Sequence, residues 1–190
     1  MTTPTSVALA ALLLLAVPED RPACHPDSQA GGIFAPDSSD SPVSPEQAQM
    51  LFEKMKALEG TWTGRSTKGW TEEVSLRVIA QGSVLQITSF DAHPNETMLT
   101  LVHKDLHRLV LTHYCVAKNQ PRLKLSEISE DGNTAVFTFL DATNLSTRDK
   151  GHMDKVVYQF EDDDHFSSQW TWYQSGTERW LEKIFLERKR

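Results

Sequence analysis

The fold is decided by residues 44–66, SPEQAQMLFEKMKALEGTWTGRS, because the spacing of the apolar residues changes at Gly60. Before Gly60 the apolar residues recur at positions 48, 51, 52, 55 and 58, which is helical spacing. Ser44 and Pro45 are typical of a helix start. After Gly60 the period becomes two and stays so to the end of the chain. The sequence therefore predicts one helix over about residues 45–58, followed only by strands.

About ten short strands are expected after the helix, separated by turn-forming residues such as Gln81-Gly82 and Asp131-Gly132-Asn133. Their expected positions are residues 61–68, 71–80, 83–90, 96–104, 107–116, 122–129, 134–141, 153–161, 165–174 and 178–188. This pattern predicts an all-β antiparallel meander. Closure into a barrel with the helix at one end pairs every strand edge, and a sandwich is the alternative. Because a barrel of about eight to ten strands can enclose a cavity, small-molecule binding is the first functional hypothesis.

The expected hairpin of residues 96–116 indicates which side of the sheet faces inward. With Asp105-Leu106 as a two-residue turn, Met98 pairs with His113. Side chains alternate between the two faces of a strand. The face expected to point inward has its strongly polar members only at its ends, and it contains Met98, Thr100, Val102, Leu109, Leu111 and His113.

The charge of the chain excludes a basic nucleic-acid binder. Its 190 residues carry 19 basic and 26 acidic side chains, a net charge of −7. Four of these negative charges and seven of the nine prolines precede residue 46. The remaining 145 residues are close to neutral, so the charge says little about the partner of the main domain.

The N-terminal residues predict export. Residues 7–17, VALAALLLLAV, are uncharged and too few to cross a hydrocarbon core of about 30 Å, but they have the length of a signal-peptide core. We expect a signal peptide at residues 1–23, a disordered Pro/Ser-rich linker at residues 24–45 and a barrel domain at residues 46–190, with no transmembrane span. The location is then secreted or periplasmic. A lipid anchor at Cys24, as in bacterial lipoproteins, is an alternative.

The residues LEGTWTG, 58–64, resemble the opening of calycin barrels, the group of lipocalins and fatty-acid-binding proteins. Gly60 and Trp62 match the Gly-x-Trp of that group, which implies that the indole lies across the closed base of the barrel. LTHYC at 111–115, NQPR at 119–122 and GHM at 151–153 resemble uncharacterised lipocalin-like bacterial proteins that are usually exported. The resemblance covers about residues 46–190 and implies a fold and a location, with no activity to carry over. The strand count is closer to fatty-acid-binding proteins and nitrobindin-like haem barrels than to eight-stranded lipocalins.

Five polar residues at expected strand ends and in the longest connection are the candidate ligand-binding residues: His113, Tyr114, Arg122, Asn144 and His152. His113 would orient a ligand in the cavity, and the planar fork of Arg122 suits a carboxylate such as that of a fatty acid. Residues 142–150 form a connection longer than a hairpin needs, as binding loops do. The leading hypothesis is an exported barrel that binds a small, largely apolar molecule of lipid or fatty-acid type.

Several alternatives remain open. His113 and Cys115 share a face and could supply two zinc ligands, but a third ligand such as His152 would have to come from elsewhere. A histidine could instead be the axial ligand of a haem, or the barrel could be filled and serve as a structural or interaction domain. No metal and no catalytic residue is assigned, because the chain has no Gly-x-Ser-x-Gly, His-Glu-x-x-His or phosphate-binding glycine loop.

Overall fold

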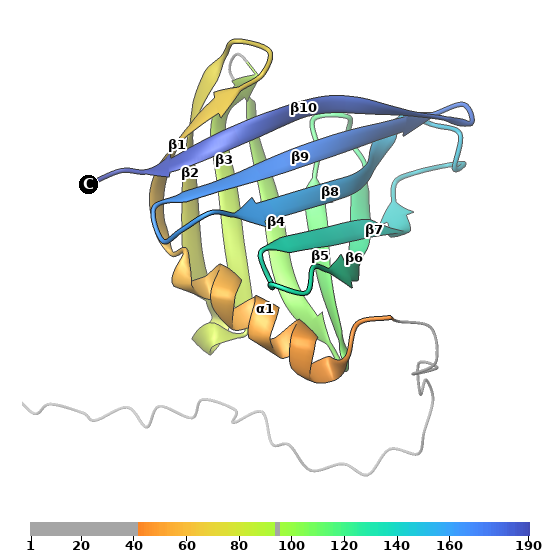
Figure 1. Ribbon diagram of the computed structural model, residues 1–190. Helices are drawn as coiled ribbons and strands as arrows, with labels where there is room; N and C mark the ends of the chain where they lie inside the picture. Colours follow the sequence, from red (N-terminus) through yellow and green to blue (C-terminus); the bar gives the residue numbers. More distant parts are fainter. Residues whose placement is uncertain (1–41, 94–95) are drawn as a thin grey trace, which may run out of the picture. The chain divides into compact units, whose positions relative to one another are not determined.

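The computed structural model describes residues 42–93 and 96–190, and within them one α-helix precedes ten strands (Figure 1). A single 3-10 turn, Ala80–Gly82, lies between the second and third strands. The elements are α1 (Pro45–Ala57), β1 (Gly60–Ser66), β2 (Thr71–Ile79), β3 (Val84–His93), β4 (Glu96–Asp105), β5 (Arg108–Tyr114), β6 (Gln120–Ile128), β7 (Thr134–Thr143), β8 (His152–Phe160), β9 (His165–Gln174) and β10 (Thr177–Arg188). The predicted signal peptide, most of the predicted linker and Cys24 lie outside the described residues.

Helix α1 begins at a capping box. The Gln47 backbone N–H donates to Ser44 Oγ at 3.2 Å, and the Ser44 backbone N–H donates to Gln47 Oε1 at 2.9 Å. These two bonds satisfy backbone donors that a helix start leaves free. The buried face of the helix carries Ala48, Leu51, Phe52 and Met55. It lies across one end of the barrel (Figure 1). None of the described helices is long and apolar enough to span a membrane.

The strands close into a barrel in which every neighbouring pair is antiparallel. Each strand from β2 to β9 pairs with its neighbours in the sequence, and β1 pairs with both β2 and β10, which closes the sheet. Closure leaves no unpaired strand edge. The predicted all-β meander barrel of about ten strands with one N-terminal helix is confirmed, and the sandwich alternative is wrong.

The hairpin of β4 and β5 confirms the predicted inward face but corrects its register. Asp105 pairs with Arg108 and Thr100 pairs with His113, so the predicted pairing of Met98 with His113 is wrong. The turn lies one residue later than expected because Leu106 adopts a left-handed conformation with φ 54°. A register shift of two residues keeps every side chain on its face. Val102, Leu109 and Leu111 accordingly lie fully buried inside the barrel.

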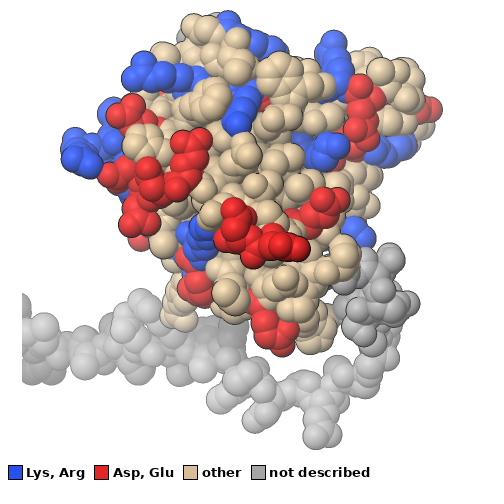
Figure 2. Space-filling view, viewed as in Figure 1, with Lys and Arg blue, Asp and Glu red and all other residues tan. Residues whose placement is uncertain are grey.

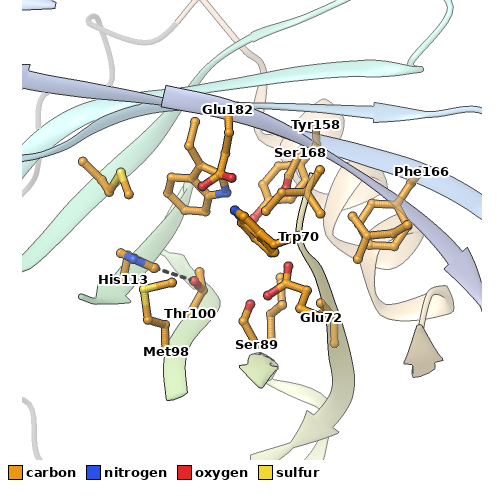
Figure 3. A pocket seen from close by; sticks show the side chains of 16 residues that line it. Trp70, Glu72, Ser89, Met98, Thr100, His113, Tyr158, Phe166, Ser168 and Glu182 are labelled. Atoms are coloured by element: carbon orange, nitrogen blue, oxygen red, sulfur yellow. Dashed lines mark hydrogen bonds between the residues drawn. The ribbon is translucent and has the colours of Figure 1, made fainter. Parts of the chain in front are cut away.

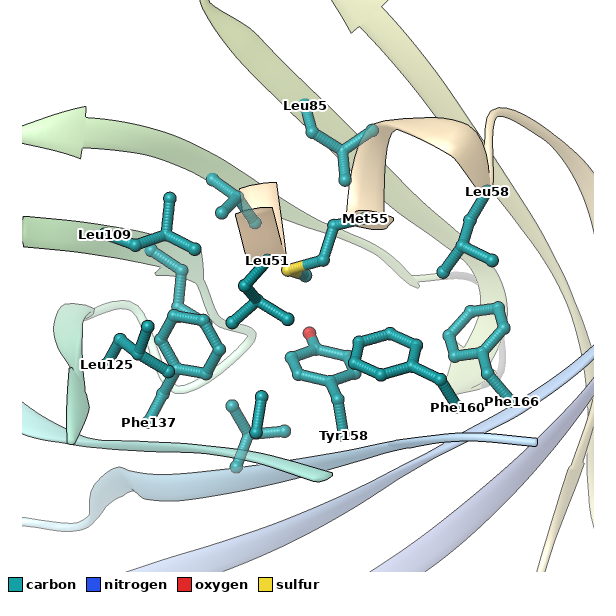
Figure 4. Packing of buried hydrophobic residues seen from close by; sticks show 14 of the residues in the cluster. Leu51, Met55, Leu58, Leu85, Leu109, Leu125, Phe137, Tyr158, Phe160 and Phe166 are labelled. Atoms are coloured by element: carbon teal, nitrogen blue, oxygen red, sulfur yellow. The ribbon is translucent and has the colours of Figure 1, made fainter. Parts of the chain in front are cut away.

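The hydrophobic core lies between α1 and the barrel wall (Figure 4). Trp62 is fully buried where α1 leads into β1, and its Nε1–H donates to the Leu58 carbonyl oxygen at 3.0 Å. The ring of Phe166 meets the indole edge-on at 4.7 Å, and the Arg188 guanidinium lies 4.3 Å from the ring centre. Gly60 has φ 146°, a conformation that other residues rarely adopt, so it allows this connection. Gly60 and Trp62 thus lie at the helix end of the barrel.

Candidate functional site

A cavity lies inside the barrel beside the core (Figure 3). Its walls extend from Tyr158 and Phe166, which also belong to the core, to Trp70 at the β1–β2 turn. That turn lies at the end of the barrel opposite α1 (Figure 1). The polar side chains of the lining are Glu72, Ser89, Thr100, His113, Tyr158, Ser168 and Glu182. The rest of the lining is apolar or aromatic, and no Lys or Arg occurs among the described residues that form it.

Two carboxylates face the cavity from the strands on either side of β1. Glu72 lies on β2 and Glu182 on β10, and each is only 6% exposed. Glu182 Oε2 accepts a hydrogen bond from Ser66 Oγ at 2.6 Å, whereas Glu72 Oε2 is buried without a hydrogen-bond partner. Gly64 pairs with Glu72, and a Cβ at Gly64 would lie 2.8 Å from Glu72 Cγ. The absence of a side chain at position 64 therefore leaves the space that Glu72 occupies.

The environment of Glu72 favours its protonated form. The pKa of Glu72 is raised from 4.5 to about 7, chiefly by burial and also by the nearby Glu182 carboxylate, while a hydrogen bond from the Ser89 side chain opposes the shift. Burial disfavours the charged form of a carboxyl group, and a like charge nearby acts in the same direction. Near neutral pH Glu72 can therefore keep its proton or, once ionised, help to hold a cation.

His113 forms the wall of the cavity on β5. It is 4% exposed, its Nδ1 lies 2.9 Å from Thr100 Oγ1, and its Nε2 is buried without a hydrogen-bond partner. Its ring lies 4.8 Å from the ring of Trp170. Burial lowers the pKa of His113 from 6.5 to about 4, so the imidazole is neutral at neutral pH. A neutral imidazole with one nitrogen held by Thr100 has its other nitrogen free to bind a ligand.

The size of the cavity limits what it can contain. Its volume is about 50 Å³. This is room for a few water molecules, whereas a cavity of about 150 Å³ takes benzene and drug-sized ligands use pockets of about 300–1,000 Å³. Haem does not fit in this volume, although a histidine, His113, lines the cavity. Trp70, Ser89 and Met98 are partly exposed, so this part of the wall borders solvent.

Of the five residues predicted to bind a ligand, His113 alone is among the residues that line this cavity. Tyr114 is 44% exposed, because neighbours on a strand point to opposite faces. Arg122 pairs across the sheet with Thr112, which neighbours inward-facing Leu111 and His113, so it points outward. There its Nε donates to Asp141 Oδ1 at 2.6 Å.

The remaining two predicted residues lie near the loop between β7 and β8. Asn144 is exposed and donates to the Lys118 carbonyl oxygen. His152 is fully buried at the start of β8, where it belongs to a separate cluster. Neither lines the cavity, so the ligand-binding role of Tyr114, Arg122, Asn144 and His152 stays a prediction that the position of this cavity does not support.

The cluster around His152 anchors the loop before β8. His152 Nδ1 donates to the Lys150 carbonyl oxygen at 2.6 Å, so its Nε2 accepts a hydrogen bond from the Arg148 guanidinium. The same guanidinium pairs with Asp154 and lies 4.2 Å and 4.0 Å from the ring centres of Phe139 and Tyr173. Each polar group of His152 thus has a partner within the protein. These contacts explain the position of His152 as support for the loop.

The zinc alternative is not supported by the geometry. Among residues 42–93 and 96–190, no group of three or more His, Cys, Asp or Glu side chains is placed to hold a metal ion. His113 lies on β5, Cys115 lies just past the end of that strand, and His152 lies in the Arg148 cluster. Charged side chains of both signs lie close together on the face of the molecule seen in Figure 2.

The two carboxylates are missing from the predicted site residues, although the sequence carries a signal for them. Glu72 lies two and four residues before Val74 and Leu76, so the three side chains point to the same face of their strand. Glu182 has the same relation to Ile184 and Leu186. All four apolar residues are buried in the barrel. A charged residue at an inward position of an alternating strand is therefore the pattern that marks this site.

Together, these features define a closed ten-stranded antiparallel barrel with a helix across one end and a small cavity that contains two carboxylates and a neutral histidine. Comparison with protein-family models gave no match. A search of curated proteins gave no significant match either.

Proposed function

We propose that this protein is an exported, calycin-like barrel that binds a small, largely apolar molecule in its cavity. The observation that carries the proposal is that Glu72 and His113, both more than nine-tenths buried, line the cavity and each have a buried polar atom without a hydrogen-bond partner. Buried polar groups are almost always hydrogen-bonded, and each exception calls for a specific explanation. A bound molecule would supply the missing partners, while the apolar and aromatic walls would hold its body.

The lining disfavours a fatty acid, the ligand type that the sequence suggested through Arg122. A fatty-acid carboxylate would meet Glu72 and Glu182 in a cavity whose described lining has no Lys or Arg. Arg122, the predicted carboxylate partner, is paired with Asp141 on the outer face instead. Like charges in a buried site repel strongly. The polar part of the ligand is therefore a neutral or cationic group.

Export is the second half of the proposal, and its support comes from the sequence. The apolar run at residues 7–17 and the linker rich in Pro and Ser that follows it fit a cleaved leader in front of a secreted or periplasmic domain. The stability of the described domain requires no disulfide, because Cys115 is its single cysteine and is free. A lipid anchor at Cys24 is the alternative form of export.

Ligand binding is tested by mass spectrometry of the protein purified from its native source, followed by thermal-shift measurements with the small molecules that it releases. We expect a released molecule to raise the melting temperature of the chain and His113→Ala to reduce that rise. His165→Ala is the control, because His165 is an exposed histidine on β9 that does not line the cavity. Failure to find any bound or stabilising molecule would refute the proposal.

A filled structural barrel is the second candidate, and the small volume of the cavity favours it. In that case ordered water would satisfy Glu72 and His113. The two functions differ in one outcome. Replacement of His113 by a residue that cannot hydrogen-bond changes ligand-dependent stabilisation in a binding barrel, whereas in a structural barrel there is no such stabilisation to change.

A further inference from the structure

The carboxylate pair in the cavity lacks a positive partner. Neither Glu72 nor Glu182 takes part in an ion pair within the described residues, although their neighbours do: Glu73, next to Glu72, pairs with Lys189 on the outer face at 2.6 Å. Glu182 has one hydrogen bond, from Ser66. Carboxylates are rarely buried without a compensating charge, because burial of an unpaired charge costs much free energy.

A second observation points to a ligand independently of the two carboxylates. On a different strand, His113 lines the same cavity, its Nδ1 is held by Thr100, and its Nε2 is buried without a hydrogen-bond partner. The indole ring of Trp70 forms a further part of the wall (Figure 3), and Trp170 also lines the cavity. Aromatic faces attract organic cations, and they also pack well against apolar groups.

We propose that the ligand of this cavity is a small organic cation, a protonated primary amine whose ammonium group lies between Glu72 and Glu182. This inference rests on the proposed ligand-binding function and names the chemical class of the ligand. The ammonium group has three N–H donors and no acceptor, which complements Glu72 Oε2 and the free positions of Glu182. Its hydrocarbon part then lies against the indole rings and reaches toward the solvent-bordering wall at Met98.

The charge and size of the site select an amine over other cations. A metal ion is not favoured, because no group of three metal-binding side chains occurs among the described residues. A quaternary ammonium group has no N–H to donate to Glu72 Oε2, whereas a primary ammonium group has three and needs little room beside the carboxylates. Gly64 provides part of that room, because any side chain there would press on Glu72.

The experiment compares three probes of equal length on the full chain by isothermal titration and by tryptophan fluorescence: propylamine, 1-propanol and propionate. At about pH 8 the amine is protonated and Glu72 is mostly ionised. We expect propylamine to bind at least about tenfold more tightly than propanol, which corresponds to about 1.4 kcal/mol, and propionate not to bind. Glu72→Gln and Glu182→Gln should each remove most of this preference for the amine over the alcohol.

Glu73→Gln is the matched control, because Glu73 is the next residue on the same strand but points outward. It should leave all three affinities unchanged. Equal binding of propylamine and propanol would overturn the amine proposal while leaving a ligand-binding cavity in place. Absence of binding by all three probes, with only ordered water in the cavity, would overturn both. The comparison of probes on the unmodified chain does not depend on the folding of any variant.

Discussion

Replacement of Glu72 or His113 should change how the stability of the protein depends on pH, and the two replacements should act in opposite directions. The folded state raises the pKa of Glu72 from 4.5 to about 7 and lowers that of His113 from 6.5 to about 4. Each shift is about 2.5 pKa units, and at about 1.4 kcal/mol per unit each is worth about 3 kcal/mol.

The sign of each contribution follows from which state holds more protons. Between about pH 4.5 and 7 the folded state keeps the proton on Glu72 that the unfolded chain has lost, so this group makes the protein less stable as pH rises. Between about pH 4 and 6.5 the unfolded chain binds a proton at His113 that the folded state does not, so this group makes the protein more stable as pH rises. In the shared window, about pH 4.5 to 6.5, the two contributions cancel.

The assay is urea unfolding at a series of pH values for the unmodified chain, Glu72→Gln and His113→Leu. Within the shared window, Glu72→Gln should become more stable by about 2 kcal/mol as pH rises, and His113→Leu should become less stable by a similar amount. The quantity compared is the slope of the free energy of unfolding against pH. Its absolute value is not compared, because His113→Leu also removes the hydrogen bond to Thr100 at every pH. Three parallel profiles would refute the assignment of these two groups as buried and oppositely shifted.

Three further predictions concern the carboxylate space, the helix start and the leader. Gly64→Ala should lower the free energy of unfolding by about 2 kcal/mol in chemical denaturation, because the added Cβ would crowd Glu72 Cγ; a variant as stable as the parent would contradict this. Ser44→Ala should cost about 1 kcal/mol through loss of the bond to Gln47, and unchanged stability would show that the capping box contributes little. Deletion of residues 1–23 should retain the protein in the cytoplasm, whereas the full chain should be exported with a new N-terminus near Cys24, as measured by fractionation and N-terminal sequencing.

Most of the fold could be predicted from the sequence because its two periodicities are clean. The capping residues Ser44 and Pro45 mark the helix start, and alternation marks each strand. The register of β4 and β5 could not be predicted, because a two-residue turn can form at Asp105-Leu106 or one residue later. The conformation of Leu106 decides between them, and leucine carries no strong preference for it.

Only part of the candidate site could be predicted, because side-chain chemistry suggests candidates but the face of the strand on which a residue lies decides whether it points inward. Arg122 and Tyr114 carry suitable chemistry, but each neighbours inward-facing residues and so points outward. Glu72 and Glu182 lie on the inward faces of their strands, where the neighbouring inward positions carry apolar side chains. Their closeness to each other depends on barrel closure, since β1 brings β2 and β10 together from opposite ends of the domain.

Strand β1 links the stability of the barrel to the chemistry of its cavity. Its inward residues are Trp62, Gly64 and Ser66, in that order. Trp62 packs at the helix end, Gly64 leaves the space for Glu72, and Ser66 donates to Glu182. Burial of two carboxylates costs free energy that the well-packed core at the helix end must offset. Apolar residues at these two positions would pack the barrel at a lower cost in free energy, and the proposed ligand is what would offset the cost of the carboxylates.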